Sequence, residues 1–82
     1  MDEKAIVILK RNVNDQGLDI EVPLEISVNE LIYGLNKGLG LGLNMNDASN
    51  YYLRSENPIA LLRGEKTLAE HGIRNGSVIY LS

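Results

Sequence analysis

The sequence predicts one α+β domain over residues 1–82: a mixed sheet of four to five strands, one crossing helix and a short helical turn. Three observations lead to this prediction. Apolar and acidic residues alternate over residues 18–22, as in a strand with one buried face. A helix-capping pattern at Ser27 and Glu30 precedes apolar residues at helical spacing. The other apolar segments are short and separated by turn-forming residues, which is typical of strands.

The first two strands are expected to form a hairpin. Residues 5–9 are apolar and rich in β-branched side chains, and residues 14–17 carry the turn formers Asn, Asp and Gly. The alternating segment follows, and Pro23 ends it because proline cannot donate to a central ladder. The side chains expected to face the core are those of Ala5, Val7, Leu9, Leu18, Ile20 and Val22.

The helix is expected to begin at a capping box, in which Ser27 is the N-cap and Glu30 the third helical residue. Apolar residues behind the cap recur at helical spacing over about three turns: Val28, Leu31, Ile32, Leu35 and Leu39. Gly38 and Gly40 are natural places for this helix to stop.

A polar loop at residues 44–50 comes next, followed by predicted strands at 50–54, 59–62 and 77–81 and one helical turn at 67–73. A hairpin, then a crossing helix, then a late strand that returns to the centre of the sheet is the β-grasp plan.

Composition limits the classes of function. Hydrophobic residues make up 44% and charged residues 23%, as in globular domains, and a net charge of -3 argues against a nucleic-acid binder. With no cysteine and one histidine, we expect no disulfide, no metal site and no cofactor. The start of the chain is acidic and the longest apolar run, Ala5 to Leu9, is far too short to cross a membrane. We therefore expect a cytoplasmic protein with no direct membrane insertion.

Three patterns could carry chemistry, and each favours a structural interpretation. The glycines of residues 38–43 follow a helix and lack a Lys-Ser/Thr pair, so they suit a helix terminator better than a phosphate loop. The oxygens of Asn44, Asn46, Asp47 and Ser49 lack the bidentate Glu of a calcium loop. His71 has no triad pattern around it, and we expect it in a solvent-facing turn. We therefore expect no enzyme activity.

Specific residues resemble known families. The segment 67–73, Thr-Leu-Ala-Glu-His-Gly-Ile, resembles the segment that precedes the last strand of ubiquitin. A closer resemblance is to the YukD/EsaB family of bacterial ubiquitin-like proteins. The helix entry of that family is matched by Asp19, Val22, Pro23, Val28, Leu31 and Ile32. Its ending is matched by Leu68, Glu70, Gly72, Ile73, Asn75, Gly76, Ile79 and Leu81, with Ser77 in place of the usual Asp.

The resemblance implies a non-conjugated accessory component of the type VII (ESX/Yuk/Ess) secretion system of Gram-positive bacteria. The implied partner is a protein, such as the secretion ATPase or a membrane channel component. The alternatives are a ubiquitin-like modifier or sulfur carrier, and a β-grasp adaptor of another pathway. Modifiers and carriers use a C-terminal Gly-Gly, and no Gly-Gly occurs in this sequence, so we expect no conjugation.

Alternation along the strands predicts an interaction surface. If Ala5, Val7 and Leu9 face the core, their neighbours in the chain face outward. In a β-grasp sheet the outward side chains of three strands would form one contiguous patch, with Arg54 at its rim: Ile6, Ile8, Tyr52, Val78 and Tyr80. We expect this patch to bind protein, since Tyr and Arg are frequent in binding hot spots, and a homodimer through it is also open. The alternative is that these side chains only raise strand propensity.

Overall fold

The computed structural model describes residues 3–44, 46 and 51–81, so most of the polar loop at 44–50 lies outside the described residues. The described elements are five strands and one helix: β1 (Lys4–Lys10), β2 (Leu18–Pro23), α1 (Val28–Leu39), β3 (Leu53–Glu56), β4 (Ala60–Leu62) and β5 (Val78–Tyr80).

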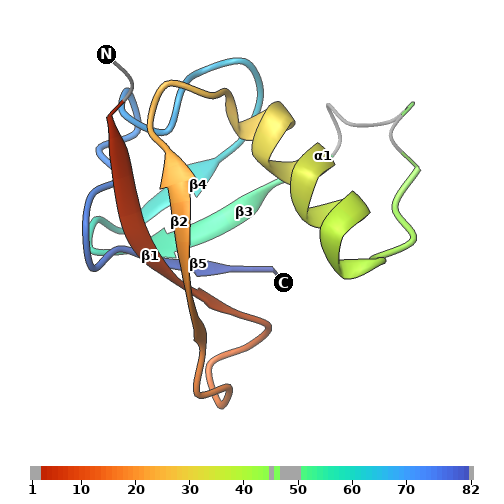
Figure 1. Cartoon of the computed structure of the whole chain (residues 1–82), viewed down its shortest axis with the longest axis horizontal. Coiled ribbons are helices and arrows are strands. Elements are labelled where there is room, and N and C mark those ends of the chain that lie inside the picture. The colour runs from red at the N-terminus through yellow and green to blue at the C-terminus, as the bar shows by residue number, and fades with distance from the viewer. Residues whose placement is uncertain (1–2, 45, 47–50, 82) are drawn as a thin grey trace.

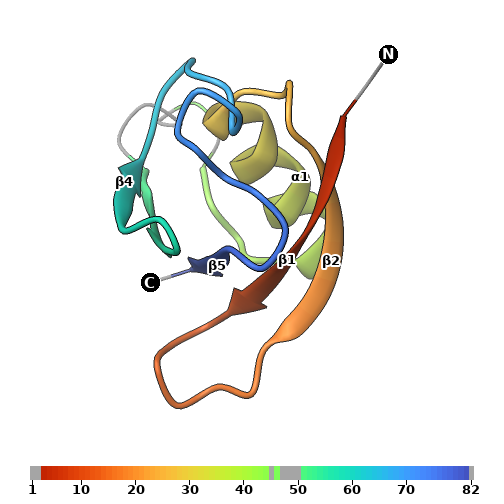
Figure 2. The same cartoon turned by 90° about the vertical axis from the view of Figure 1, so that its left-hand side faces the viewer.

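The strands form one mixed sheet in the order β2-β1-β5-β3-β4. β1 and β5 are parallel, and the other neighbours are antiparallel. Figures 1 and 2 show α1 crossing one face of this sheet, while the turn of the β1–β2 hairpin extends beyond the helix. The predicted β-grasp fold is confirmed. Its strands β3, β4 and β5 are shorter than, or shifted from, the predicted segments.

Local hydrogen bonds fix both ends of α1. The Glu30 backbone N–H donates to Ser27 Oγ (3.0 Å), and the Ser27 backbone N–H donates to Glu30 Oε1 (3.1 Å), which confirms the capping box. Gly40 ends the helix in the left-handed conformation (φ 64°), and its N–H donates to the Asn36 carbonyl. The predicted helical turn at 67–73 is a single hydrogen-bonded turn, in which the His71 N–H donates to the Thr67 carbonyl (3.2 Å).

The core lies between α1 and the inner face of the sheet. Its buried hydrophobic cluster comprises Ala5, Val7, Leu9, Val22, Val28, Leu31, Ile32, Leu53, Leu62, Leu68, Ile73 and Ile79. The expected inward direction of Ala5, Val7 and Leu9 is therefore confirmed. Leu18 is instead 58% exposed, because it lies at the hairpin end of an edge strand, past the cover that the helix provides.

Leu61 and Leu62 are neighbours in β4 that offer a test of this packing. Leu62 is fully buried, whereas Leu61 is 50% exposed. We expect Leu62→Ala to lower the free energy of unfolding by about 2–5 kcal/mol, because it removes transfer energy and leaves a cavity. Leu61→Ala is the matched control and should cost under about 1 kcal/mol. Urea denaturation measures both, and equal losses would contradict the assigned strand orientation.

Candidate protein-interaction surface

The outer face of the sheet carries an apolar group at its centre. Ile6 and Ile8 alternate with buried residues along β1, and the parallel register places Val78 of β5 beside Ile8. Ile6 is 51% exposed, and Ile8 and Val78 are half-buried. The backbone of β1 and β5 thus brings together three of the six predicted site residues. We call Ile6, Ile8 and Val78 the central patch.

A tight turn supports Ile8 from below. Gly17 has a φ of 89°, and a Cβ atom on it would lie 2.5 Å from Ile8 Cγ2, so only glycine fits here without a shift. Asp15 holds this turn by accepting from the backbone N–H groups of Arg11 (3.0 Å) and Gly17 (3.2 Å). These hydrogen bonds lower the pKa of the Asp15 carboxyl.

Tyr80 also lies on the outer face, but it is only 7% exposed. Arg54 stands directly opposite it in β3, with its guanidinium carbon 5.7 Å from the centre of the ring. The Tyr80 hydroxyl donates to Glu56 Oε1. The prediction that Tyr80 is an exposed member of the patch is therefore wrong, because two charged side chains from β3 lie against it.

A second apolar group, which the sequence reasoning missed, lies toward the β4 edge. Ile59 is 89% exposed and Leu61 50% exposed, and Tyr52 of the predicted set is 54% exposed at the start of β3. Leu61 stands opposite Arg54, so it belongs to the same outer face. A groove of about 430 Å³ runs over Tyr80 between the two exposed residues Ile59 and Val13. Alternation in β4, with Leu62 inward, would have indicated the outward direction of Leu61.

The predicted set is thus divided by the ionic side chains around Tyr80. Ile6, Ile8 and Val78 lie on one side of Arg54 and Glu56, and Tyr52 lies with the β4 residues on the other. The expected single contiguous patch is replaced by two apolar groups on one face.

The charges that flank the central patch are acidic. Asp19 stands opposite Ile8, and Glu21 stands opposite Ile6, both exposed on β2. Lys4 Nζ lies 3.9 Å from Glu21 Oε1, in a pair that is more than half exposed. A surface ion pair of this kind contributes little stability, so these charges remain available to orient a partner.

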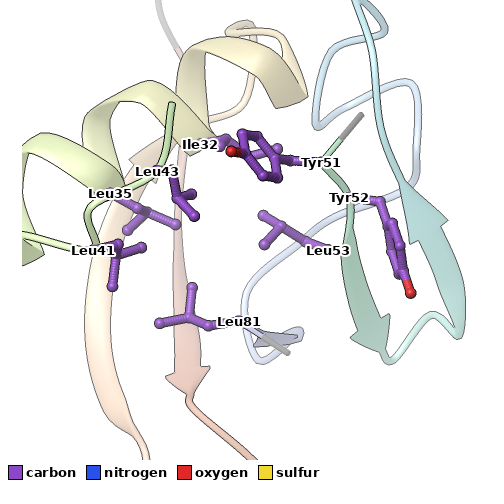
Figure 3. Close-up of a pocket in the computed structure, with 8 residues that line it drawn as sticks. All are labelled: Ile32, Leu35, Leu41, Leu43, Tyr51, Tyr52, Leu53 and Leu81. Carbon is purple, nitrogen blue, oxygen red and sulfur yellow. The ribbon is translucent and has the colours of Figure 1, made fainter. Parts of the chain in front are cut away.

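The glycine-rich segment after α1 folds back toward the core. The Asn36 side chain accepts from the Leu43 N–H (2.8 Å) and donates to the Leu43 carbonyl (3.2 Å). Leu43 packs against the core, as expected for a leucine of this segment. Figure 3 shows the apolar side chains around a small cavity of about 80 Å³ here, with Tyr52 directed away from the others: Ile32, Leu35, Leu41, Leu43, Tyr51, Tyr52, Leu53 and Leu81.

The remaining candidates have structural roles. Glu70 accepts from the Thr67 N–H (2.8 Å), and Thr67 Oγ1 accepts from the Glu70 N–H (3.1 Å), so the turn is capped and the pKa of Glu70 is lowered. His71 is half-buried rather than facing solvent. Asp47 and Ser49 of the calcium candidate lie outside the described residues. In the part of the chain that is described, no three His, Asp or Glu side chains are grouped to hold a metal ion. No described helix has the length and apolar character needed to cross a membrane.

Comparison with solved structures identifies the class of fold. The chain is similar to a ubiquitin-like domain from tubulin-binding cofactor B, with a TM-score of 0.72, 22% identity and coverage of 98% of this chain and 89% of that chain. It is also similar to the C-terminal ubiquitin-like domain of mouse tubulin-specific chaperone e, with a TM-score of 0.64, 13% identity and coverage of 99% and 84%. A de novo design based on ubiquitin has a TM-score of 0.64, 18% identity and coverage of 96% and 87%. The protein has a ubiquitin-like fold.

The family follows from the sequence. The model described as "WXG100 protein secretion system (Wss), protein YukD" matches residues 6–81. The chain belongs to the YukD family, and it is a ubiquitin-like module associated with secretion. No curated protein sequence matches it.

The contact between Tyr80 and Glu56 predicts a measurable titration. The hydrogen bond to the Glu56 carboxylate stabilises the protonated phenol and raises the pKa of Tyr80 above its ordinary value of 10.0; burial and the negative charge of Glu56 act in the same direction. Because the folded-state pKa is raised, this contribution to stability is present below pH 10 and is lost as the pH rises through the folded pKa.

Absorbance at 295 nm, compared with that of Tyr80→Phe, isolates the Tyr80 titration. We expect Glu56→Gln to move the pKa of Tyr80 down toward its ordinary value. An unchanged Tyr80 titration in Glu56→Gln would show that Glu56 does not govern it.

Proposed function

We propose that this protein is a non-catalytic docking module of a type VII secretion machine, and that it binds its partner through the outer face of the sheet. The family assignment supports the secretion role. The observation that carries the docking proposal is the central patch, three aliphatic side chains on a sheet face that α1 does not cover. Exposed apolar groups rimmed by polar residues often mark protein-binding sites.

The charges beside the patch describe the partner surface that would fit. Asp19 and Glu21 border Ile8 and Ile6 on the β2 side. A complementary partner would present an aliphatic centre with basic residues along one side, because charge complementarity gives orientation and faster association. The six predicted residues divide the work: Ile6, Ile8 and Val78 supply apolar area, and Tyr52 and Arg54 form the far rim.

Tyr80 acts in this proposal as a support for Arg54. Its ring lies under the guanidinium, and its hydroxyl bonds Glu56, so it holds two charges of the rim in place. The proposed partner is a cytosolic or membrane-anchored part of the secretion machine, such as its ATPase or a channel component. We also propose that the protein acts in the cytoplasm without covalent attachment; the sequence contains no Gly-Gly for an activating enzyme to use.

Affinity capture from the native host tests the docking proposal. Ile6→Glu is the test variant and Tyr33→Glu is its matched control, because both positions are 51% exposed and Tyr33 lies on α1. We expect wild type and Tyr33→Glu to recover secretion ATPase or channel components. Ile6→Glu should reduce that recovery about 10-fold or more, because it puts a charge into the apolar contact.

Two results would contradict the proposal. Recovery of an adenylating enzyme, or a covalent adduct seen by intact-mass analysis, would indicate modifier or carrier chemistry. Recovery of secretion components that falls equally for Ile6→Glu and Tyr33→Glu would show that the sheet face is not the specific contact.

A further inference from the structure

The two edges of the sheet differ in charge. β2 and β4 are the edge strands, and each has backbone groups on its outer side without a neighbouring strand. β2 carries the exposed acidic residues Asp19 and Glu21, which protect an edge against pairing with a copy of itself. The segment 57–62, which includes β4, carries no charged residue.

The β4 edge also exposes aliphatic side chains. Ile59 is 89% exposed and Leu61 50% exposed, and Leu61 is on the outer face. Ile59 is the most exposed of the large hydrophobic residues that the structure describes. This edge therefore combines open backbone groups, no charge and apolar side chains.

We infer that β4 pairs with β4 of a second copy of this chain in an antiparallel, two-fold arrangement centred on Ala60. The sheet then continues across the two copies with both helices on the same side. Ile59 stands opposite Leu61 of the second copy, and Leu61 stands opposite its Ile59, so four aliphatic side chains meet on the outer face. On the inner face, Leu62 stands opposite Pro58 of the second copy.

Charge selects this pairing over its alternatives. A pairing centred on Leu61 places Arg63 opposite Ile59 and so sets a charge against an aliphatic side chain. A β2–β2 pairing centred on Ile20 places Asp19 opposite Glu21 of the second copy, and like charges directly opposite are destabilising. The β4 pairing centred on Ala60 sets no charge against an apolar side chain among its three apolar pairs.

The short edge sets the strength of the dimer. β4 has three residues, so the contact is far smaller than a standard interface and the dimer is weak and reversible. The dimer leaves Ile6, Ile8 and Val78 open. Its test therefore fails or succeeds independently of the proposed docking function.

A cysteine cross-link tests the register. The chain has no cysteine, so Ala60→Cys introduces a single thiol. On the two-fold axis the two Cα atoms are roughly 4.5–5.5 Å apart, which suits a disulfide. Ile20→Cys is the matched control, since Ile20 is also half-buried on an edge strand. With oxidised glutathione we expect a disulfide-linked dimer of Ala60→Cys and not of Ile20→Cys; equal cross-linking of both variants would overturn the proposal.

A concentration series of amide NMR spectra on the unmodified chain provides the second measurement. We expect peaks of residues 57–63 to shift as the protein rises from about 20 µM to about 2 mM, as for a weak dimer. Leu61→Lys should weaken association about 10-fold or more, and Ile6→Lys, at a site of equal exposure, should leave it unchanged. Spectra that do not change with concentration, or shifts confined to the central patch, would overturn the proposal.

Discussion

The parallel pairing of β1 with β5 is the constraint on which the rest of the structure depends. It joins the first and last strands at the centre of the sheet, with Leu9 beside Ile79 on the core side and Ile8 beside Val78 on the outer side. Hydrogen bonds beyond the two strands extend it: the Ile6 N–H donates to Asn75 Oδ1 (2.7 Å), and the Ile6 carbonyl accepts from Gly76 (2.9 Å). A residue near the start of the chain is thereby fixed against the turn before β5.

The same pairing determines what the outer face can do. It sets an aliphatic group between the acidic side chains of β2 and the ionic side chains of β3. Since α1 covers the other face, the outer face is left to contact partners, and its charges differ from one side to the other. A surface of this kind favours one orientation of a partner over others.

The sequence was sufficient to predict the fold, because local patterns and topology agree. The capping box at Ser27, the left-handed Gly40 and the alternation of residues 5–9 each depend on near neighbours in the chain. The site was predicted in part. The outward direction of Ile6 and Ile8 follows from period two, whereas the burial of Tyr80 depends on Arg54 and Glu56, more than 20 residues away in the chain. The exposure of Leu18 likewise depends on where the helix ends over the sheet, which no pattern within β2 records.

The measurement that tests the central claim most directly is a titration of isotope-labelled protein with the purified cytosolic part of a type VII secretion ATPase, followed by amide NMR. The account predicts saturable shifts centred on Ile6, Ile8 and Val78, with smaller shifts at Asp19 and Glu21. Saturable binding with shifts confined to α1 would contradict it.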